Sequence, residues 1–168
     1  MDIDQWIKDW CYEVVGEPCW MVRVGGCTGS RFTLDLGAKI PRTPVRWNPA
    51  FSAEANENRG KYWLHVGCAN WAFGIDRPGE TRIITDSNAD CSPNGPMVAG
   101  LETLIGHTVK SVTIDTATCD LNMYFEQGDL RLKVFGGVSD EQDGYRLGMP
   151  ERIICIDGPE RITFEALE

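Results

Sequence analysis

The chain contains the same order of local patterns twice, and this repetition constrains its fold more than any other feature. One copy runs through residues 6–76 and the other through residues 97–157. Each opens with a helix-like apolar pattern that ends in a glycine, Gly16 in one copy and Gly106 in the other, 90 residues apart. Strand-like segments, a Tyr-x-Leu segment and an Ile-Asp pair follow in both. The repetition predicts two similar halves, and chance matches among common turn and strand residues are the alternative.

The periodicity of the apolar residues predicts an α+β fold. Apolar residues recur at three- and four-residue steps from Ile3 to Val14, which indicates one face of a helix. Asp2 or Asp4 can cap this helix, and Gly16 can end it. We predict that each half is a helix packed on antiparallel strands. The first half spans residues 1–90, the second spans residues 91–168, and the two share one core.

The remaining segments are predicted from alternation and from turn residues. A second, shorter helix is expected from Met97 to Ile105, with Pro96 in its first turn. Residues 41–59 hold several prolines and are predicted to form a long loop, either mobile or functional. Strands are predicted, from period-two patterns between turn signals, at residues 20–24, 31–36, 61–66, 71–75, 81–85, 108–114, 121–125, 130–135, 153–156 and 161–164.

Charge narrows the choice of partners. The 168 residues carry a formal net charge of -9, with a pI of about 4.7. An acidic surface repels phosphate backbones and anionic lipids, so nucleic acid and membranes are poor partner candidates. A basic protein is a better candidate, although an acidic balance can also serve solubility alone. Residues 1–5 lack the pattern of a secretory signal, and no long apolar run occurs, so a cytoplasmic location is expected.

Metal and nucleophile patterns are weak. Seven widely spaced cysteines do not indicate a disulfide framework. His65 and Cys68, with Cys91 and His107, contain the residue types of a zinc site, but their spacing does not require them to converge. Cys68 beside either histidine has the residue types of a thiolate nucleophile, yet no strand–turn–helix element presents it. No G-x-S-x-G motif occurs. We therefore predict no cofactor, no metal and no catalytic residue.

Two acidic loops are the remaining candidates for a site. Asp86 and Asp90 enclose a Ser-Asn pair and resemble a cation-binding cluster, but EF-hand spacing is absent and an Asx-rich turn explains them equally well. Asp140, Glu141 and Asp143 form the second acidic loop. Both loops can face a basic partner, and these five carboxylates are the predicted partner-binding residues.

A resemblance supports the same reading. Residues 104–106 read Leu-Ile-Gly, and residues 121–135 read L-x-M-x-F-x-x-G-x-L-x-L-x-V-F, which is similar to the pattern L-x-G, L-x-L-x-F-x-x-G-x-L-x-V. The first half adds a Leu-His-Val strand ahead of a cysteine, at residues 64–68. In these features the chain resembles a group of small bacterial proteins, some of which are similar to toxin-immunity proteins. The resemblance implies a fold and a kind of partner, and it carries over no functional residue.

The leading expectation is a cytoplasmic immunity protein that neutralises a basic toxin through its acidic loops. The alternative is a small-molecule or metal-binding domain with a cleft between the halves and with His65 and Cys68 at its edge. A hydrolytic enzyme centred on Asp86, Asp90 or Cys68 is the third possibility. Neither the partner's identity nor the oligomeric state follows from these patterns.

Overall fold

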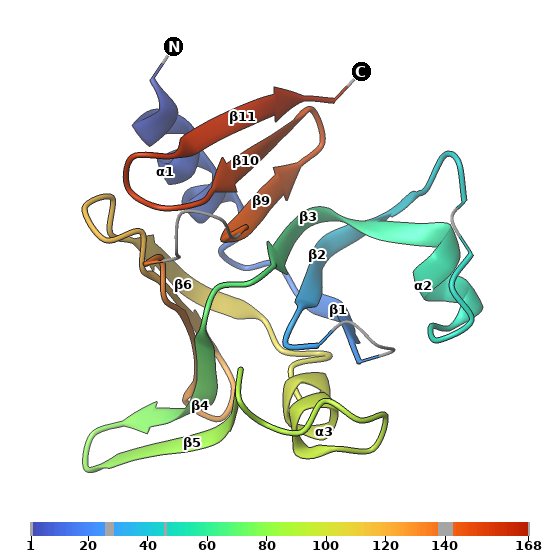
Figure 1. Ribbon diagram of the computed structural model, residues 1–168, viewed down its shortest axis with the longest axis vertical. Coiled ribbons are helices and arrows are strands. Elements are labelled where there is room, and N and C mark those ends of the chain that lie inside the picture. The colour runs from blue at the N-terminus through green and yellow to red at the C-terminus, as the bar shows by residue number, and fades with distance from the viewer. Residues whose placement is uncertain (1, 26–28, 46, 138–142, 168) are drawn as a thin grey trace.

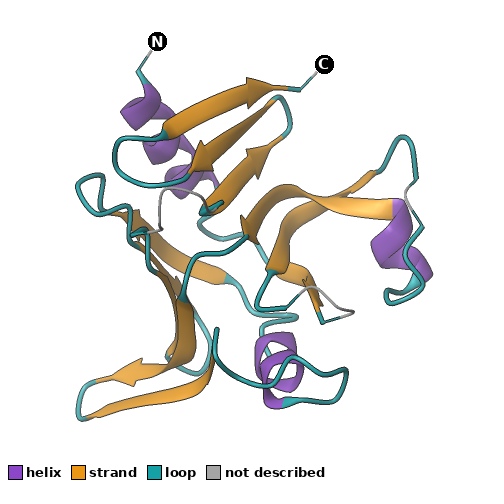
Figure 2. Cartoon of the chain, in the orientation of Figure 1, coloured by secondary structure: helices purple, strands orange, loops and turns teal. Residues whose placement is uncertain are grey.

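The chain folds into two antiparallel sheets with few helices (Figures 1 and 2). The computed structural model describes residues 2–25, 29–45, 47–137 and 143–167. The helices within them are α1 (Ile3–Glu13), α2 (Ala53–Glu57) and α3 (Pro96–Glu102). The strands within them are β1 (Cys19–Val24), β2 (Phe32–Pro41), β3 (Asn58–Val66), β4 (Trp71–Arg77), β5 (Glu80–Asp86), β6 (Val109–Ile114), β7 (Leu121–Phe125), β8 (Leu130–Val134), β9 (Tyr145–Met149), β10 (Arg152–Ile156) and β11 (Ile162–Ala166).

Each sheet takes strands from both parts of the chain. The six-stranded sheet has the order β1-β2-β3-β9-β10-β11, and the five-stranded sheet has the order β5-β4-β8-β7-β6. The chain therefore leaves the first sheet after β3 and returns to it after β8. As a result, the β4–β5 hairpin pairs with β8, and the β9–β11 segment pairs with β3. The division into sheets does not follow the predicted boundary at residue 90.

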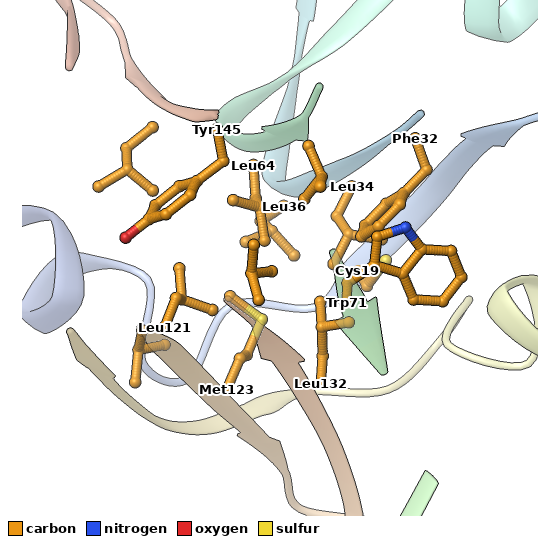
Figure 3. Packing of buried hydrophobic residues seen from close by; sticks show 14 of the residues in the cluster. Cys19, Phe32, Leu34, Leu36, Leu64, Trp71, Leu121, Met123, Leu132 and Tyr145 are labelled. Carbon is orange, nitrogen blue, oxygen red and sulfur yellow. The ribbon is translucent and has the colours of Figure 1, made fainter. Parts of the chain in front are cut away.

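The core lies between the inner faces of the two sheets (Figure 3). Leu34 and Leu64 of the first sheet and Met123 and Leu132 of the second are fully buried in one hydrophobic cluster. These strands alternate buried and less buried residues, as expected for a sheet with one face in the core. Each such side chain contributes about 1.5–3 kcal/mol when it is removed from water.

Two of the helices follow their predictions. The Asp2 side chain caps α1 by accepting a hydrogen bond from the Asp4 amide at 3.1 Å. The indole of Trp10 on α1 is buried and donates a 3.0 Å hydrogen bond to the Gly148 carbonyl in β9. Helix α1 also packs against β6, and α3, which begins at Pro96, packs against β1 and β5. None of the described helices is long and apolar enough to cross a bilayer.

The prediction of a long loop at residues 41–59 was wrong in its second half. That half contains α2, and β3 begins directly after it at Asn58. Ser52 caps α2 by accepting a hydrogen bond from the Ala55 amide, and Asn56 is buried. The Asn56 amide group binds three backbone carbonyls and its oxygen accepts from the Asn48 amide. A five-residue helix held by side-chain hydrogen bonds leaves little apolar periodicity to detect.

The two glycine turns at residues 16–19 and 106–109 lie side by side. Gly16 and Gly106 both have positive φ angles, of 85° and 90°, which glycine adopts at little cost. Four backbone hydrogen bonds join the turns, in two equivalent pairs. Gly16 N donates to Val109 O as Gly106 N donates to Cys19 O, and Val109 N donates to Glu17 O as Cys19 N donates to His107 O.

The two sheets also share a register. The β1–β2 and β6–β7 ladders have the same kind of irregularity, after their first pairs, Cys19 with Leu36 and Val109 with Phe125. Strands β1, β2, β3 and β9 of the first sheet are equivalent in order and register to strands β6, β7, β8 and β4 of the second. One inward-facing row is Val24, Phe32, Val66, Tyr145 in the first sheet, and its equivalent in the second is Ile114, Leu121, Val134, Trp71, all buried except the partly buried Ile114. The two Tyr-x-Leu segments are antiparallel neighbours, with Leu64 opposite Leu147.

Candidate anion-binding site

Charged side chains gather on the outer face of the six-stranded sheet. In β1, β2 and β3 the apolar residues point to the core, so the intervening residues point outward. The register brings Arg23, Thr33, His65 and Arg146 into one row across β1, β2, β3 and β9. The neighbouring outward row contains Asp35 and Trp63.

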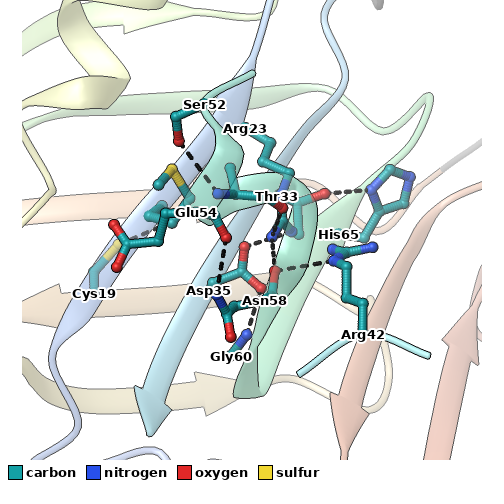
Figure 4. A network of polar contacts seen from close by, with 12 residues as sticks. Cys19, Arg23, Thr33, Asp35, Arg42, Ser52, Glu54, Asn58, Gly60 and His65 are labelled. Atoms are coloured by element: carbon teal, nitrogen blue, oxygen red, sulfur yellow. Dashed lines mark hydrogen bonds and ion pairs between the residues drawn. The ribbon is translucent and has the colours of Figure 1, made fainter. Parts of the chain in front are cut away.

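An ion pair between Arg23 and Asp35 forms the floor of this site (Figure 4). Arg23 Nη1 lies 2.5 Å from Asp35 Oδ2, and the two side chains are 11% and 0% exposed. Asp35 Oδ1 accepts a 2.7 Å hydrogen bond from the Gly60 amide. Arg23 Nη2 donates to the carbonyls of Ala55 and Asn58, at 3.1 and 2.8 Å. Protein groups therefore already engage Arg23 and neutralise its charge.

Arg42 and Arg59 add positive charge above that floor. Both are partly buried. Arg42 donates from Nε to the Asn58 carbonyl at 2.9 Å. Among the residues that the structure describes, neither guanidinium forms an ion pair with a carboxylate. These groups line a pocket of about 350 Å³, whose lining is Arg23, Thr33, Asp35, Arg42, Arg59, Trp63 and His65.

The Asp35 carboxyl does not offset this positive charge completely. Burial raises the pKa of the Asp35 carboxyl above its ordinary value, and Arg23, the Gly60 amide, Arg42 and Arg59 oppose that rise. Three guanidinium groups thus surround one carboxyl. Because the pocket is partly shielded from water, an anion inside it interacts with the arginines more strongly than it would at an open surface.

His65 is a neutral polar group in the pocket wall. Its Nδ1 atom shares a 2.8 Å hydrogen bond with Thr33 Oγ1. Burial lowers the pKa of His65, the positive charges of Arg146 and Arg31 lower it further, and Asp143 opposes the change. A neutral imidazole adds no charge to the arginines beside it.

Trp63 supplies an aromatic wall because the strand beside it carries a glycine. Trp63 lies opposite Gly148 in the β3–β9 ladder. A Cβ atom built at Gly148 would come within 1.8 Å of the Trp63 ring. The indole therefore covers the β9 backbone at this position, and any larger residue at 148 would displace it.

Two of the predicted acidic residues, Asp86 and Asp90, cap turns with their side chains. Asp86 accepts a 2.8 Å hydrogen bond from the Asn88 amide. Asp90 accepts from the amide and the hydroxyl of Ser92, and these bonds lower the pKa of Asp90. Asp143 is exposed, and its carbonyl accepts from the Cys68 amide. Asp140 and Glu141 lie outside the described residues.

Two of these acidic positions flank one short crossover segment, residues 67–70 between β3 and β4. Asp143 bonds to it at Cys68, through the backbone. Ser87, which follows Asp86, forms a 3.4 Å side-chain hydrogen bond with Asn70 at the other end. Asp86 and Asp143 therefore lie on either side of the same surface segment.

The proposed His65 and Cys68 pair has separate partners. His65 binds Thr33, whereas the Cys68 sulfur accepts a 3.5 Å hydrogen bond from Arg31. Within the described part of the chain, no three His, Cys, Asp or Glu side chains come close enough together to hold a metal ion. His65 is thus the one member of the pair that lines the pocket.

Comparison with known proteins adds no family assignment. No protein-family model, no curated protein and no solved structure matches this chain. The description of the site therefore rests on its own geometry.

Sequence reasoning missed the arginines. Arg23 and Asp35 were visible as single charged residues inside apolar alternation, Val22-Arg23-Val24 and Leu34-Asp35-Leu36. Such a charge signals an outward position in a strand. The glycines at residues 25 and 26 indicated a turn between the strands that became β1 and β2, but nothing in the sequence placed β3 beside β2 or brought Arg42 and Arg59 to the same pocket.

Proposed function

We propose that the protein binds a small anionic ligand in the arginine-lined pocket. The observation that carries this proposal is the excess of positive charge: three arginines and one carboxyl line a pocket in a chain of net charge -9. Guanidinium groups form strong, paired hydrogen bonds with carboxylates and phosphates. The pocket also has the volume typical of sites for small ligands.

The location of the pocket supports a binding role. It lies on the outer face of a sheet whose other face belongs to the core, so its walls rest on rigid strands. Arg23 holds the carbonyls of Ala55 and Asn58 and thereby fixes the segment that carries Arg59. The anion-binding groups are thus oriented before a ligand arrives, which reduces the entropy lost on binding.

Calorimetric titration of the purified protein with phosphate, sulfate and succinate tests this proposal. At least one of these anions should bind at a 1:1 ratio, and the affinity should fall as ionic strength rises. The double variant Arg42→Gln/Arg59→Gln should bind roughly a hundredfold more weakly, since each charged hydrogen bond is worth about 1.5–3 kcal/mol. Arg82→Gln, on exposed β5, is the matched control and should bind as the wild type. Equal binding by the double variant and the control would contradict the proposal.

Toxin neutralisation in the cytoplasm is the second candidate. One arrangement favours it: Asp86 and Asp143 flank the crossover at residues 67–70, and Asp90 is exposed in the loop that follows β5. These loops present carboxylates at the surface, where charge complementarity speeds encounter with a basic partner. The net charge of -9 acts in the same direction.

The gene adjacent to this one supplies the probe for that candidate. Its purified product should bind the protein in surface plasmon resonance, and the triple variant Asp86→Asn/Asp90→Asn/Asp143→Asn should bind at least tenfold more slowly, as expected for lost electrostatic steering. Asp9→Asn/Glu102→Gln, with acidic positions elsewhere, is the control. Absence of binding by the wild type would remove this candidate and leave the anion proposal intact.

We also propose that the chain arose by duplication and that each half is a helix packed on antiparallel strands. In this arrangement the last strands of each half pair with the sheet of the other half. The matching hydrogen bonds of residues 16–19 and 106–109 and the shared register of the sheets support this idea. Residues 1–90 and 91–168, expressed separately, should then fold only when mixed, since β4–β5 and β9–β11 pair across the division. Independent folding of either fragment would contradict this arrangement.

A further inference from the structure

We infer that the ligand of the pocket is a phosphate monoester attached to an aromatic ring, with the phosphate between Arg42 and Arg59 and the ring against Trp63. This inference rests on the proposed anion-binding function and narrows it to one chemical class. Three features of the pocket carry it: the amount of uncompensated charge, the donors left unused, and the position of the indole.

The charge of the lining matches a dianion. Arg23, Arg42 and Arg59 face the single carboxyl of Asp35, so about two positive charges remain without a negative partner in the lining. His65 adds none while its imidazole is neutral. A phosphate monoester carries about -1.5 to -2 at neutral pH, whereas a single carboxylate carries one negative charge. The phosphate is therefore the better match.

The available donors place the phosphate at one end of the pocket. Arg23 is occupied by Asp35 and two backbone carbonyls. Among the described residues, the Arg42 guanidinium bonds only the carbonyl of Asn58, the residue before Arg59, and it does so through Nε. In the described part of the structure, no hydrogen bond engages the terminal nitrogens of Arg42 or the guanidinium of Arg59. Two guanidinium forks can hold the three acceptor oxygens of a phosphate.

The indole of Trp63 supplies the site for a ring. It is partly buried, lies over the β9 backbone at Gly148, and lines the same pocket as both arginines. A planar ring held in this way offers a flat apolar surface to a second ring at little cost in side-chain entropy. Neighbouring guanidinium groups add favourable contacts with aromatic faces.

Three probes test the inference by calorimetry: inorganic phosphate, phenyl phosphate and benzoate. Phenyl phosphate should bind roughly fivefold to a hundredfold more tightly than inorganic phosphate, the range expected for one aromatic stacking contact. Benzoate should bind more weakly than phenyl phosphate. Trp63→Leu should lower the affinity for phenyl phosphate much more than the affinity for inorganic phosphate, so that the ratio of the two affinities falls towards one, and Trp63→Phe should keep part of that ratio.

Tyr12→Leu is the control for these variants because Tyr12 is an exposed aromatic residue on α1. Equal affinities of the wild type for phenyl phosphate and inorganic phosphate would overturn the inference, as would benzoate binding equal to phenyl phosphate. Either result would leave the anion-binding proposal standing. Failure of all three probes, together with sulfate and succinate, would instead overturn the anion-binding proposal itself.

Discussion

The outer faces of the two sheets have equivalent positions in their strand ladders, but they differ in how the positive charges are paired. The first sheet has two outward rows: Arg23, Thr33, His65, Arg146 and Met21, Asp35, Trp63, Gly148. The equivalent rows of the second sheet are Thr113, Asn122, Lys133, Ala72 and Ser111, Tyr124, Arg131, Gly74. On the second sheet Arg131 lies 2.9 Å from Asp76, and Lys133 lies 3.5 Å from Asp120. On the first sheet Arg42 and Arg59 add charge without such partners. The same backbone ladder forms with either arrangement, so the charge excess is not a requirement of the fold.

The glycines at equivalent positions make the same point. Gly148 leaves room for the Trp63 side chain, whereas a Cβ at Gly74 would come within 2.1 Å of the Arg82 carbonyl oxygen. One glycine accommodates a pocket wall and the other accommodates the backbone of a neighbouring strand. Gly148 therefore makes room for a wall of the pocket, whereas Gly74 makes room for the backbone of β5.

The largest expected effect concerns the buried ion pair. Asp35→Ala leaves the Arg23 guanidinium buried without its carboxyl, which should lower the free energy of unfolding by about 3–5 kcal/mol. Tyr124→Phe, at the equivalent position of the second sheet, removes one hydrogen bond to Asp76 and should cost only about 1 kcal/mol. Urea denaturation measures both changes.

A double variant separates the buried charge from lost packing. Asp35→Leu/Arg23→Met replaces the pair with apolar side chains and should recover much of the stability lost in Asp35→Ala, because no charge stays unpaired. If the double variant were as unstable as the single one, the ion pair would not be the cause. The difference in stability between the Asp35 and Tyr124 variants would then have another cause.

The next effect concerns Gly148. Gly148→Ala brings a methyl group into the Trp63 ring and should cost about 1–3 kcal/mol through overpacking. Adding Trp63→Leu should restore part of that loss, since the obstacle is a side chain. The methyl group of Gly74→Ala would instead lie against the backbone of Arg82, so truncating a neighbouring side chain should not restore the lost stability. Thermal unfolding of the four variants distinguishes the two causes.

A smaller effect separates paired from unpaired arginines. Arg131→Gln removes the contacts with Asp76 and Asn122 and should cost about 1 kcal/mol, because those groups are only partly buried. Arg42→Gln/Arg59→Gln removes two mutually repelling charges and should leave stability within about 0.5 kcal/mol of the wild type in the absence of added anions. A marked loss in the latter would mean that these arginines stabilise the fold.

The smallest expected effect is a pH dependence from His65. Its pKa is lower in the folded protein, so the unfolded chain takes up a proton first as the pH falls. The stability associated with neutral His65 is therefore complete above the ordinary histidine pKa of about 6.5 and is lost as the pH falls through the folded value. His65→Gln should remove this component from a plot of stability against pH. In the wild type, saturating phosphate should weaken this pH dependence of stability, since a bound anion raises the pKa of His65. An unchanged pH profile with phosphate would place the anion elsewhere.

Much of the secondary structure followed from local patterns. The alternation of Phe32, Leu34 and Leu36 predicted β2 and its buried face, and the cap at Asp2 and the stop at Gly16 predicted the limits of α1. Helix α2 escaped prediction because it has only five residues and is held by hydrogen bonds of the Asn56 side chain to nearby backbone carbonyls. Of the predicted partner-binding residues that the structure describes, Asp86 and Asp90 cap turns, and Asp143 bonds to Cys68 through its backbone. His65 lines the pocket beside Thr33.

By itself the sequence determined which residues face inward along each strand, because side chains alternate with a period of two, and where glycines let the chain turn. It also determined the net charge of -9. Only the tertiary structure decided that β3 pairs with β9 and β8 with β4, since contacts between distant segments choose the neighbours of a strand. The pairing of β3 with β9 sets Trp63 over Gly148, and the pairings of β1 with β2 and of β2 with β3 bring Arg23, Asp35 and His65 onto one face. A local excess of positive charge on an acidic chain is therefore a property of strand order and not of composition.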